Sequence, residues 1–167
     1  YTRVNVPTSY RAGIELQGSG QISAKISANA NLTLSKNKIK AFDEWMDAYD
    51  ANWEWTGQTS VSHKNTHIAL SPETIANYGL HWQAQPSLQV SLLGKYVGSQ
   101  FLDNTSNEQR KLKEFYTQDI RVMYSLKNLG IKEWNLIFQL NNVFNKKYEP
   151  NGYTFSYNYS GTVITEN

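Results

Sequence analysis

Apolar and polar residues alternate with a period of two along several segments of this chain. Between residues 22 and 34, apolar side chains occupy every second position and polar side chains fill the positions between them. Successive side chains of a β-strand point to opposite faces, so the pattern predicts one strand with an apolar face and a polar face. The segment is longer than the roughly 5–6 residues typical of soluble strands and is long enough for a tilted membrane-crossing strand, which needs about 9–11.

The same alternation recurs in other segments, so we predict six strands and a weaker seventh over residues 153–159. The further segments are 10–17, 77–84, 88–96, 119–126 and 134–141. Every charge in the six strands falls on the polar face. A Lys or Arg facing lipid at mid-bilayer would cost about 2–4 kcal/mol, but a soluble β-sandwich also keeps charges out of its core. Alternation alone therefore leaves both architectures open.

The connections between the predicted strands alternate between short and long. We expect short turns at residues 18–20, 85–87 and 127–132, and long links at 36–72 and 103–114. Outer-membrane barrels have short turns at one end and long loops at the other. Aromatic residues also lie near strand ends, where rings with polar tips suit the lipid–water boundary, although aromatics favour strands in general. They are Tyr10, Trp82, Tyr96, Trp134, Phe144 and Tyr148.

The composition excludes several classes of protein. A net charge of +2 gives no concentrated basic face for nucleic acid. The absence of Cys excludes a disulfide framework and thiolate chemistry, and no stretch approaches the roughly 18 apolar residues of a membrane helix. We find no nucleophile elbow or phosphate loop. We therefore predict no enzyme, no metal site at His63 and His67, and no cofactor.

Two groups of residues are candidates for ligand contact. Residues 41–55 carry rings at helical spacing, which favours a short amphipathic helix within an outside loop. Its exposed rings are the best ligand-contact candidates, namely Trp45, Tyr49, Trp53 and Trp55, although a compact loop also packs its own rings together. Four polar residues would face a barrel lumen, Lys95, Asp119, Arg121 and Gln139. The interpretation that we favour is that they pair across strands or contact a plug, without binding substrate.

Several segments resemble TonB-dependent outer-membrane receptors in sequence, and they are most similar to receptors of the Bacteroidetes branch. Residues 141–149, which read NNVFNKKYE, match the penultimate-strand pattern of that family best, and residues 151–155 follow as expected. Further similar segments are 31–39, 71–72, 95–105 and 110–112. The resemblance implies an all-β, antiparallel transmembrane β-barrel fragment, with residues 1–167 forming the C-terminal part of a plugged barrel of about 22 strands. The plug domain and the closing strand would be absent from this chain.

The family resemblance also implies partners and a role. Such receptors sit in outer-membrane lipid of bacteria, carry an N-terminal plug domain, and are driven by the TonB energy-coupling protein through the N-terminal part. They import scarce nutrients, and an iron chelate of siderophore or haem-like kind is the expected ligand here. Two alternatives remain, a complete small outer-membrane barrel with an adhesive or structural role and a soluble ligand-binding β-sandwich. A fragment of a larger barrel would expose unpaired strand edges and an apolar face.

Overall fold

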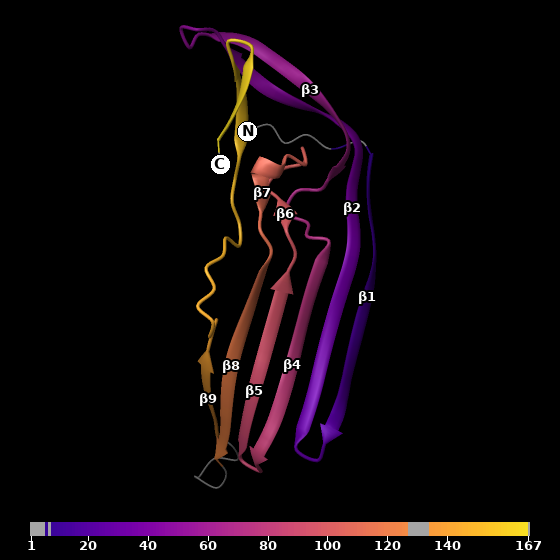
Figure 1. The fold of residues 1–167 in the computed structure, drawn as a ribbon, viewed down its shortest axis with the longest axis vertical. Coiled ribbons are helices and arrows are strands. Elements are labelled where there is room, and N and C mark those ends of the chain that lie inside the picture. The colour runs from indigo at the N-terminus through magenta and orange to yellow at the C-terminus, as the bar shows by residue number, and fades with distance from the viewer. Residues whose placement is uncertain (1–5, 7, 127–133, 167) are drawn as a thin grey trace.

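One curled, mostly antiparallel sheet dominates the computed structural model, which describes residues 6, 8–126 and 134–166 (Figure 1). Within these residues the sheet has nine strands, in the order β11-β10-β2-β4-β5-β8-β9, with β1 and β3 also paired to β2. The strands are β1 (Thr8–Ser23), β2 (Ile26–Tyr49), β3 (Trp55–His67), β4 (Thr74–Gln85), β5 (Leu88–Val97), β8 (Phe115–Leu126), β9 (Trp134–Leu140), β10 (Phe155–Tyr159) and β11 (Thr162–Glu166). The open, half-barrel sheet confirms the predicted fold class.

The link between β5 and β8 folds into a small structure of its own. It contains β6 (Gln100–Phe101), the 3₁₀-helix η1 (Glu108–Arg110) and β7 (Lys111–Leu112), and β6 pairs with β7. In Figure 1 these elements lie above the ends of β4, β5 and β8, beneath the bent upper part of β2 and β3. Across the residues described, no helix has the length and apolar character needed to cross a membrane.

The predicted turn at residues 18–20 is wrong, because the first hairpin turns at Ala24 and Lys25. Gly18 pairs with Ala30 and Gly20 pairs with Ala28, well inside the β1–β2 ladder. The alternation over residues 22–34 therefore spans the end of one strand and the start of the next. Paired residues lie on the same face, and a two-residue turn alone would shift the alternation by one residue, as in the pair Ser23 and Ile26. The irregularity between Gln21 and Ser23 offsets this shift, so Gly20 pairs with Ala28 and the period of two continues past the turn and hides it.

The predicted helix over residues 41–55 is also wrong. β2 continues to Tyr49, the chain turns over residues 50–54, and β3 begins at Trp55, opposite Tyr49. The Asp50 side chain accepts the backbone N–H groups of Asn52 and Glu54, at 2.8 and 2.9 Å, which fixes the turn. Pairing with β3 overrides the helical spacing of the rings, and most of the predicted long link at 36–72 is strand.

The other predicted strands are found near their expected positions. β4, β5 and β8 cover the predicted segments 77–84, 88–96 and 119–126, and β9 covers the predicted segment 134–141 except for its last residue. The turn between β4 and β5 falls at Pro86 and Ser87. The weak seventh strand is β10, which forms a hairpin with β11 and pairs in parallel with the upper end of β2. The predicted short turn at 127–132 lies outside the described residues.

The two faces of the lower sheet differ sharply. On one face, Leu80 lies opposite Leu92, and Phe138 lies opposite Val122. This apolar face is uncovered, since Trp82 is 51% exposed and Phe138 is 68% exposed. A β-sandwich would bury such a face against a second sheet, and the described residues place no second sheet there.

The opposite face of the sheet is a network of polar side chains. The Asn77 side-chain amide donates to Asn31 Oδ1 at 2.9 Å, and His81 bridges Asn29 and Ser91 at 2.8 and 2.9 Å. Polar groups directly opposite one another on neighbouring strands stabilise a sheet through such pairs. An apolar face and a hydrogen-bonded polar face on one sheet fit a wall between lipid and water.

One polar side chain on the apolar face is shielded by tyrosines. Gln118 is only 6% exposed, and its side-chain oxygen accepts hydrogen bonds from the hydroxyl groups of Tyr78 and Tyr116. The ring of Tyr78 reaches Gln118 across Gly94, where an added Cβ would lie 2.2 Å from the ring. Gly94 therefore leaves the space that lets Tyr78 cover this amide.

We expect Gly94→Val to destabilise the folded protein by about 1–3 kcal/mol, because an added side chain must displace the Tyr78 ring. Displacement would also uncover Gln118 on the apolar face. The measurement is unfolding by denaturant in lipid vesicles. Gly18→Val is the matched control, since a Cβ at Gly18 meets no atom within 4 Å, and an equal loss in both variants would contradict the role of Tyr78.

Candidate ligand groove at the upper end of the sheet

A deeply buried arginine holds the upper elements together. Arg110, from η1, donates from Nη1 to Glu44 Oε1 at 3.1 Å and to Asp103 Oδ2 at 2.5 Å. Its Nη2 donates to Thr165 Oγ1 at 2.7 Å and to Ser156 Oγ. The guanidinium thereby joins the β5–β8 link to β2, β10 and β11. The Arg110 side chain is only 4% exposed.

The charge of Arg110 is well compensated. Burial alone would lower the pKa of Arg110, but the hydrogen bonds and charges of Asp103 and Glu44 raise it above the ordinary value for arginine. The second oxygen of Glu44 contacts His63 Nε2 at 2.9 Å. Breaking a buried ion pair by removing one partner is costly, so Arg110 fixes the position of every element that it contacts.

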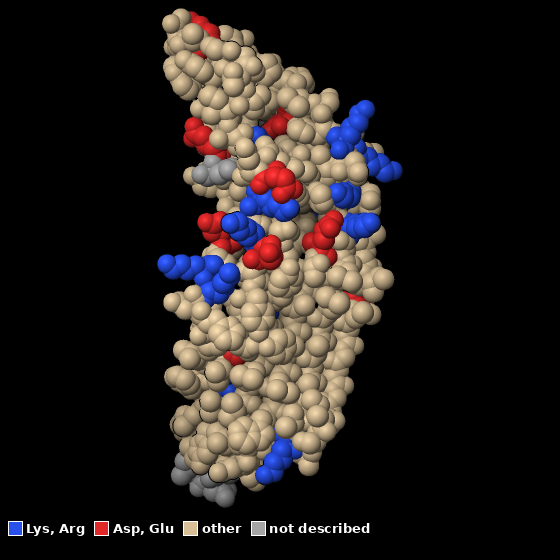
Figure 2. Space-filling view, in the orientation of Figure 1, with Lys and Arg blue, Asp and Glu red and all other residues tan. Residues whose placement is uncertain are grey.

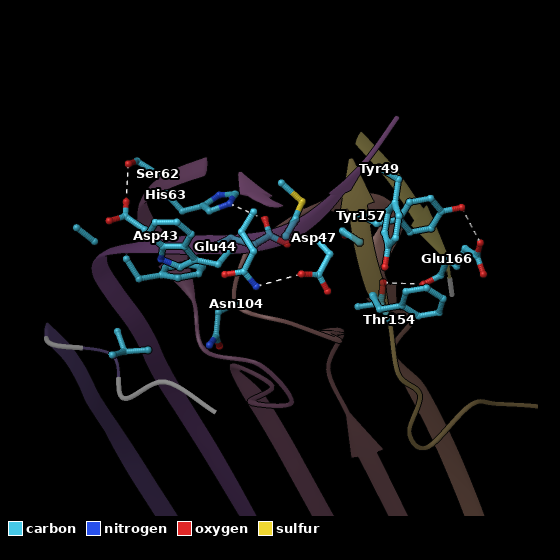
Figure 3. Close-up of a pocket in the computed structure, with 18 of the residues that line it drawn as sticks. Asp43, Glu44, Asp47, Tyr49, Ser62, His63, Asn104, Thr154, Tyr157 and Glu166 are labelled. Carbon is cyan, nitrogen blue, oxygen red and sulfur yellow. Dashed lines mark hydrogen bonds and ion pairs between the residues drawn. The ribbon is translucent and has the colours of Figure 1, made fainter. Parts of the chain in front are cut away.

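Next to the Arg110 partners Glu44 and Ser156, the upper parts of β2 and β3 and the β10–β11 hairpin line a groove of about 1880 Å³. Figure 3 shows Asp43, Glu44 and His63 on one side of the groove, with Tyr49 and Tyr157 on the other. Carboxylates and aromatic rings are the main functional groups of its lining. Such a lining can contact a ligand through flat ring faces and accept hydrogen bonds from ligand donors.

Three of the four predicted ligand-contact residues line this groove. They are Trp45, Tyr49 and Trp53, whereas Trp55 is not among the lining residues. Trp55 instead contacts a residue of the lining, because its Nε1 donates to Asp47 Oδ1 at 3.4 Å. Gln58 Nε2 donates to the same Asp47 oxygen at 3.1 Å, so Trp55 and Gln58 both orient a carboxylate of the groove.

Tyr49 and Trp53 belong to a cluster of five rings that spans two hairpins, and the other three are Phe155, Tyr157 and Tyr159. The centroid of Trp53 lies 4.4 Å from that of Tyr159 and 5.8 Å from that of Tyr157, and Tyr49 lies 6.3 Å from Tyr157. The rings therefore pack against one another, as the alternative of a compact loop expected. Trp53 nevertheless remains 57% exposed and keeps surface for a ligand. The spacing of residues 41–55 does not indicate that Tyr157 and Tyr159 contact these rings, because β10 is distant from β2 in the chain.

The four residues predicted to face the lumen lie on the polar face of the sheet, away from this groove. Arg121 and Gln139 are opposite one another, and Arg121 Nε donates to Gln139 Oε1 at 2.8 Å. Asp119 Oδ1 accepts the backbone N–H of Asn142 at 2.8 Å. Lys95 lies on the same face, between Asn77 and Thr117. Arg121 and Gln139 thus pair across strands, and the four residues do not form one cluster.

The two histidines singled out in the sequence lie on β3. His63 stacks on Phe42 with ring centroids 5.0 Å apart and contacts Glu44. His67 Nε2 lies 2.8 Å from Lys38 Nζ, and its Nδ1 lies 2.9 Å from Ser106 Oγ. Each histidine therefore has its own separate partners. Among the described residues, no three His, Asp or Glu side chains form a group suited to a metal ion.

Comparison with known proteins relates the chain to a membrane receptor. The ferrioxamine receptor of Yersinia enterocolitica is 26% identical over 149 residues, and the match covers 89% of this chain. The chain is a distant relative of the TonB-dependent receptors. It spans only about a fifth of its relative, since the match covers 19% of that receptor. No protein-family model matches the chain.

Relationship to TonB-dependent receptors agrees with the curled sheet and its two unlike faces. These receptors are transporters and not enzymes, and together with the sheet they suggest an outer-membrane location for this chain. This relationship gives a context for the groove, which lies at the upper end of the sheet, beyond the apolar face.

Proposed function

We propose that this chain forms the C-terminal part of the barrel of a TonB-dependent receptor that imports an iron chelate, of siderophore or haem-like kind. The ligand binds on the outer side of a bacterial outer membrane. The N-terminal plug domain of the same receptor closes the lumen, and the TonB protein supplies energy through that N-terminal part. The chain contributes barrel wall, outer loops and part of the ligand path.

The observation that carries this proposal is the division of one sheet into two unlike faces. Trp82 and Phe138 project from a face that no described element covers, and Asn31, Asn77 and His81 bond to their neighbours on the other. Exposed apolar surface of this extent is unfavourable in water. It becomes favourable when the face meets lipid and the polar face meets an aqueous lumen.

The ligand-contact role falls to the groove and to its aromatic residues. Trp45, Tyr49 and Trp53 line the groove, and Trp55 acts through Asp47. On the polar face below, Lys95, Asp119, Arg121 and Gln139 form part of the lumen wall through which a ligand passes. Large rings with exposed faces are the side chains that contribute most to binding at protein surfaces.

We expect Trp45→Ala and Trp53→Ala each to weaken ligand binding by about 2 kcal/mol, or roughly thirtyfold in Kd. Trp55→Ala should weaken binding less, because it only loosens Asp47. Binding of the chelate to cells that carry the whole receptor measures the effect. Trp134→Ala is the control, since Trp134 lies on β9 at the far end of the sheet from the groove. Equal losses in all four variants would contradict a binding role for the groove.

Uptake of radioactive iron by cells that express the whole receptor tests the proposed transport. The cells receive a ferric hydroxamate, a ferric catecholate or haem, in strains with and without TonB. We expect uptake of one of these chelates, and we expect it to cease without TonB. Uptake that persists without TonB would overturn the receptor assignment. TonB-dependent uptake of a glycan or a cobalamin alone would overturn the iron chelate.

A further inference from the structure

An exposed aromatic ring lies between two carboxylates in the lining of the groove described above. Asp43, Trp45 and Asp47 occupy alternate positions of β2, and all three line the groove. Alternate residues of a strand point to the same side and lie about 6.6 Å apart along it. The residues opposite them on β3 are uncharged, namely Ser62, Ser60 and Gln58. One side of β2 therefore presents an acid, a ring and a second acid in a row, which we call the acid–indole row (Asp43, Trp45 and Asp47).

The two carboxylates of the acid–indole row are held in place by neutral donors. Ser62 Oγ donates to Asp43 Oδ1 at 2.5 Å, and the Trp55 and Gln58 side chains donate to Asp47 Oδ1. In the described part of the chain, neither carboxylate forms an ion pair with a lysine, arginine or histidine. Each therefore keeps its negative charge uncompensated, and its Oδ2 atom is not used by any of these donors.

The groove as a whole is negative. Charged side chains gather over the upper elements in Figure 2, whereas the lower part of that face carries few. Glu166 lines the other side of the groove (Figure 3), and its Oε1 accepts the Tyr157 hydroxyl at 3.1 Å. Glu44 also lines the groove, but Arg110 compensates its charge. Lys64 is the only lysine or arginine among the described lining residues, so the groove repels ligands with anionic groups.

The ring of the acid–indole row is available to a ligand. Trp45 is 61% exposed, and among the described residues no other ring stacks on it. Tyr49 and Trp53, by contrast, contact each other, with ring centroids 6.1 Å apart. The face of an indole attracts a cation more strongly than that of any other aromatic side chain. A free indole face beside an uncompensated carboxylate is an arrangement that recognises an ammonium group.

We propose that the groove binds an iron chelate that carries a free ammonium group, and that this group lies on the Trp45 ring with its N–H bonds directed to Asp47. An ammonium group has three donors and no acceptor, so it matches a carboxylate whose orientation two neutral donors already fix. Asp43 and Glu166 add to the negative potential without contact. The inference rests on the proposed function and narrows its ligand, because haem and ferric tris-catecholates carry anionic groups that the groove would repel.

The test compares three forms of one chelate that differ in the charge at a single position. A linear ferric trihydroxamate with a terminal amine is used as the ammonium form, as the N-acetylated neutral form and as the N-succinylated anionic form. Quenching of tryptophan fluorescence in the purified whole receptor measures the Kd of each. We expect the ammonium form to bind roughly tenfold more tightly than the acetylated form, since an exposed ion pair and a cation–π contact each contribute a few-fold. The succinylated form should bind most weakly.

Substitution of Asp47 should change this preference and not only the affinity. Asp47→Asn should reduce the roughly tenfold preference for the ammonium form to less than about threefold, and Asp47→Lys should favour the succinylated form over the ammonium form. Glu54→Gln is the matched control, because it removes a carboxylate from the exposed turn between β2 and β3, and Glu54 is not among the lining residues. We expect Glu54→Gln to keep the preference within about twofold of its original value.

The outcomes distinguish failure of this inference from failure of the proposed function. Equal Kd values for the three forms, together with iron uptake that needs TonB, would overturn the inference alone. The same conclusion would follow if the receptor bound none of the three forms but imported haem or a ferric catecholate, or if Glu54→Gln lost the preference as far as Asp47→Asn. If no ferric chelate enters cells that contain TonB, the proposed function fails, and the inference fails with it.

Discussion

Leu92→Arg is expected to destabilise the folded protein in lipid by about 2–4 kcal/mol, the cost of an arginine that faces the middle of a bilayer. Leu92 lies on the apolar face, between Leu80 and Ile120. The next residue offers the matched control, because Leu93 lies on the polar face between Gly79 and Asp119. An arginine at position 93 meets the Asp119 carboxylate, so Leu93→Arg should change stability by less than about 1 kcal/mol.

Urea unfolding of the whole receptor in lipid vesicles measures this difference between the two variants. Both variants replace a leucine of β5 by arginine, so they differ only in the face of the sheet that carries the new side chain. A larger loss for Leu93→Arg would reverse the assignment of lipid and lumen to the two faces. Similar large losses for both would indicate that protein covers both faces, as in a soluble sandwich.

The sheet and its faces could be predicted because a period of two survives in any strand with unlike faces. The segment from Leu88 to Tyr96 shows this directly, since its alternation matches the observed pairs with β4 and β8. The exact positions of the turns were harder to predict from the sequence. The turn at Ala24 and Lys25 does not interrupt the pattern, and Gly18 and Gly20 suggested a turn where the structure has a regular ladder.

The groove was only partly predictable. Trp45, Tyr49 and Trp53 were found as candidates because rings and acids are dense in residues 41–55, although the expected helix is a hairpin of β2 and β3. Tyr157 and Arg110 were missed, because their roles depend on pairing between distant segments. Arg110 joins residues that are 66 and 55 positions away in the chain, and no local pattern in the sequence records such contacts.

Arg110→Ala is expected to cost about 3–5 kcal/mol of stability in the upper elements, because it leaves Glu44 and Asp103 without their buried partner. Ser156 and Thr165 lose a donor at the same time. We expect the β10–β11 hairpin to loosen first, since Arg110 connects it to β2 and to the β5–β8 link. Hydrogen exchange of residues 155–166 in the whole receptor should therefore accelerate, while exchange in β4 and β5 stays slow.

Lys111→Ala is the matched control, because Lys111 follows Arg110 directly and forms an ion pair of a different kind. Its Nζ contacts Glu108 Oε2 at 3.0 Å, and the Glu108 side chain is 74% exposed. Exposed pairs contribute about 0–1 kcal/mol, so exchange of residues 155–166 should remain close to that of the unaltered protein. Equal acceleration in the two variants would mean that the hairpin is held by its ring contacts, with Trp53 and Tyr159 foremost, and not by the buried guanidinium.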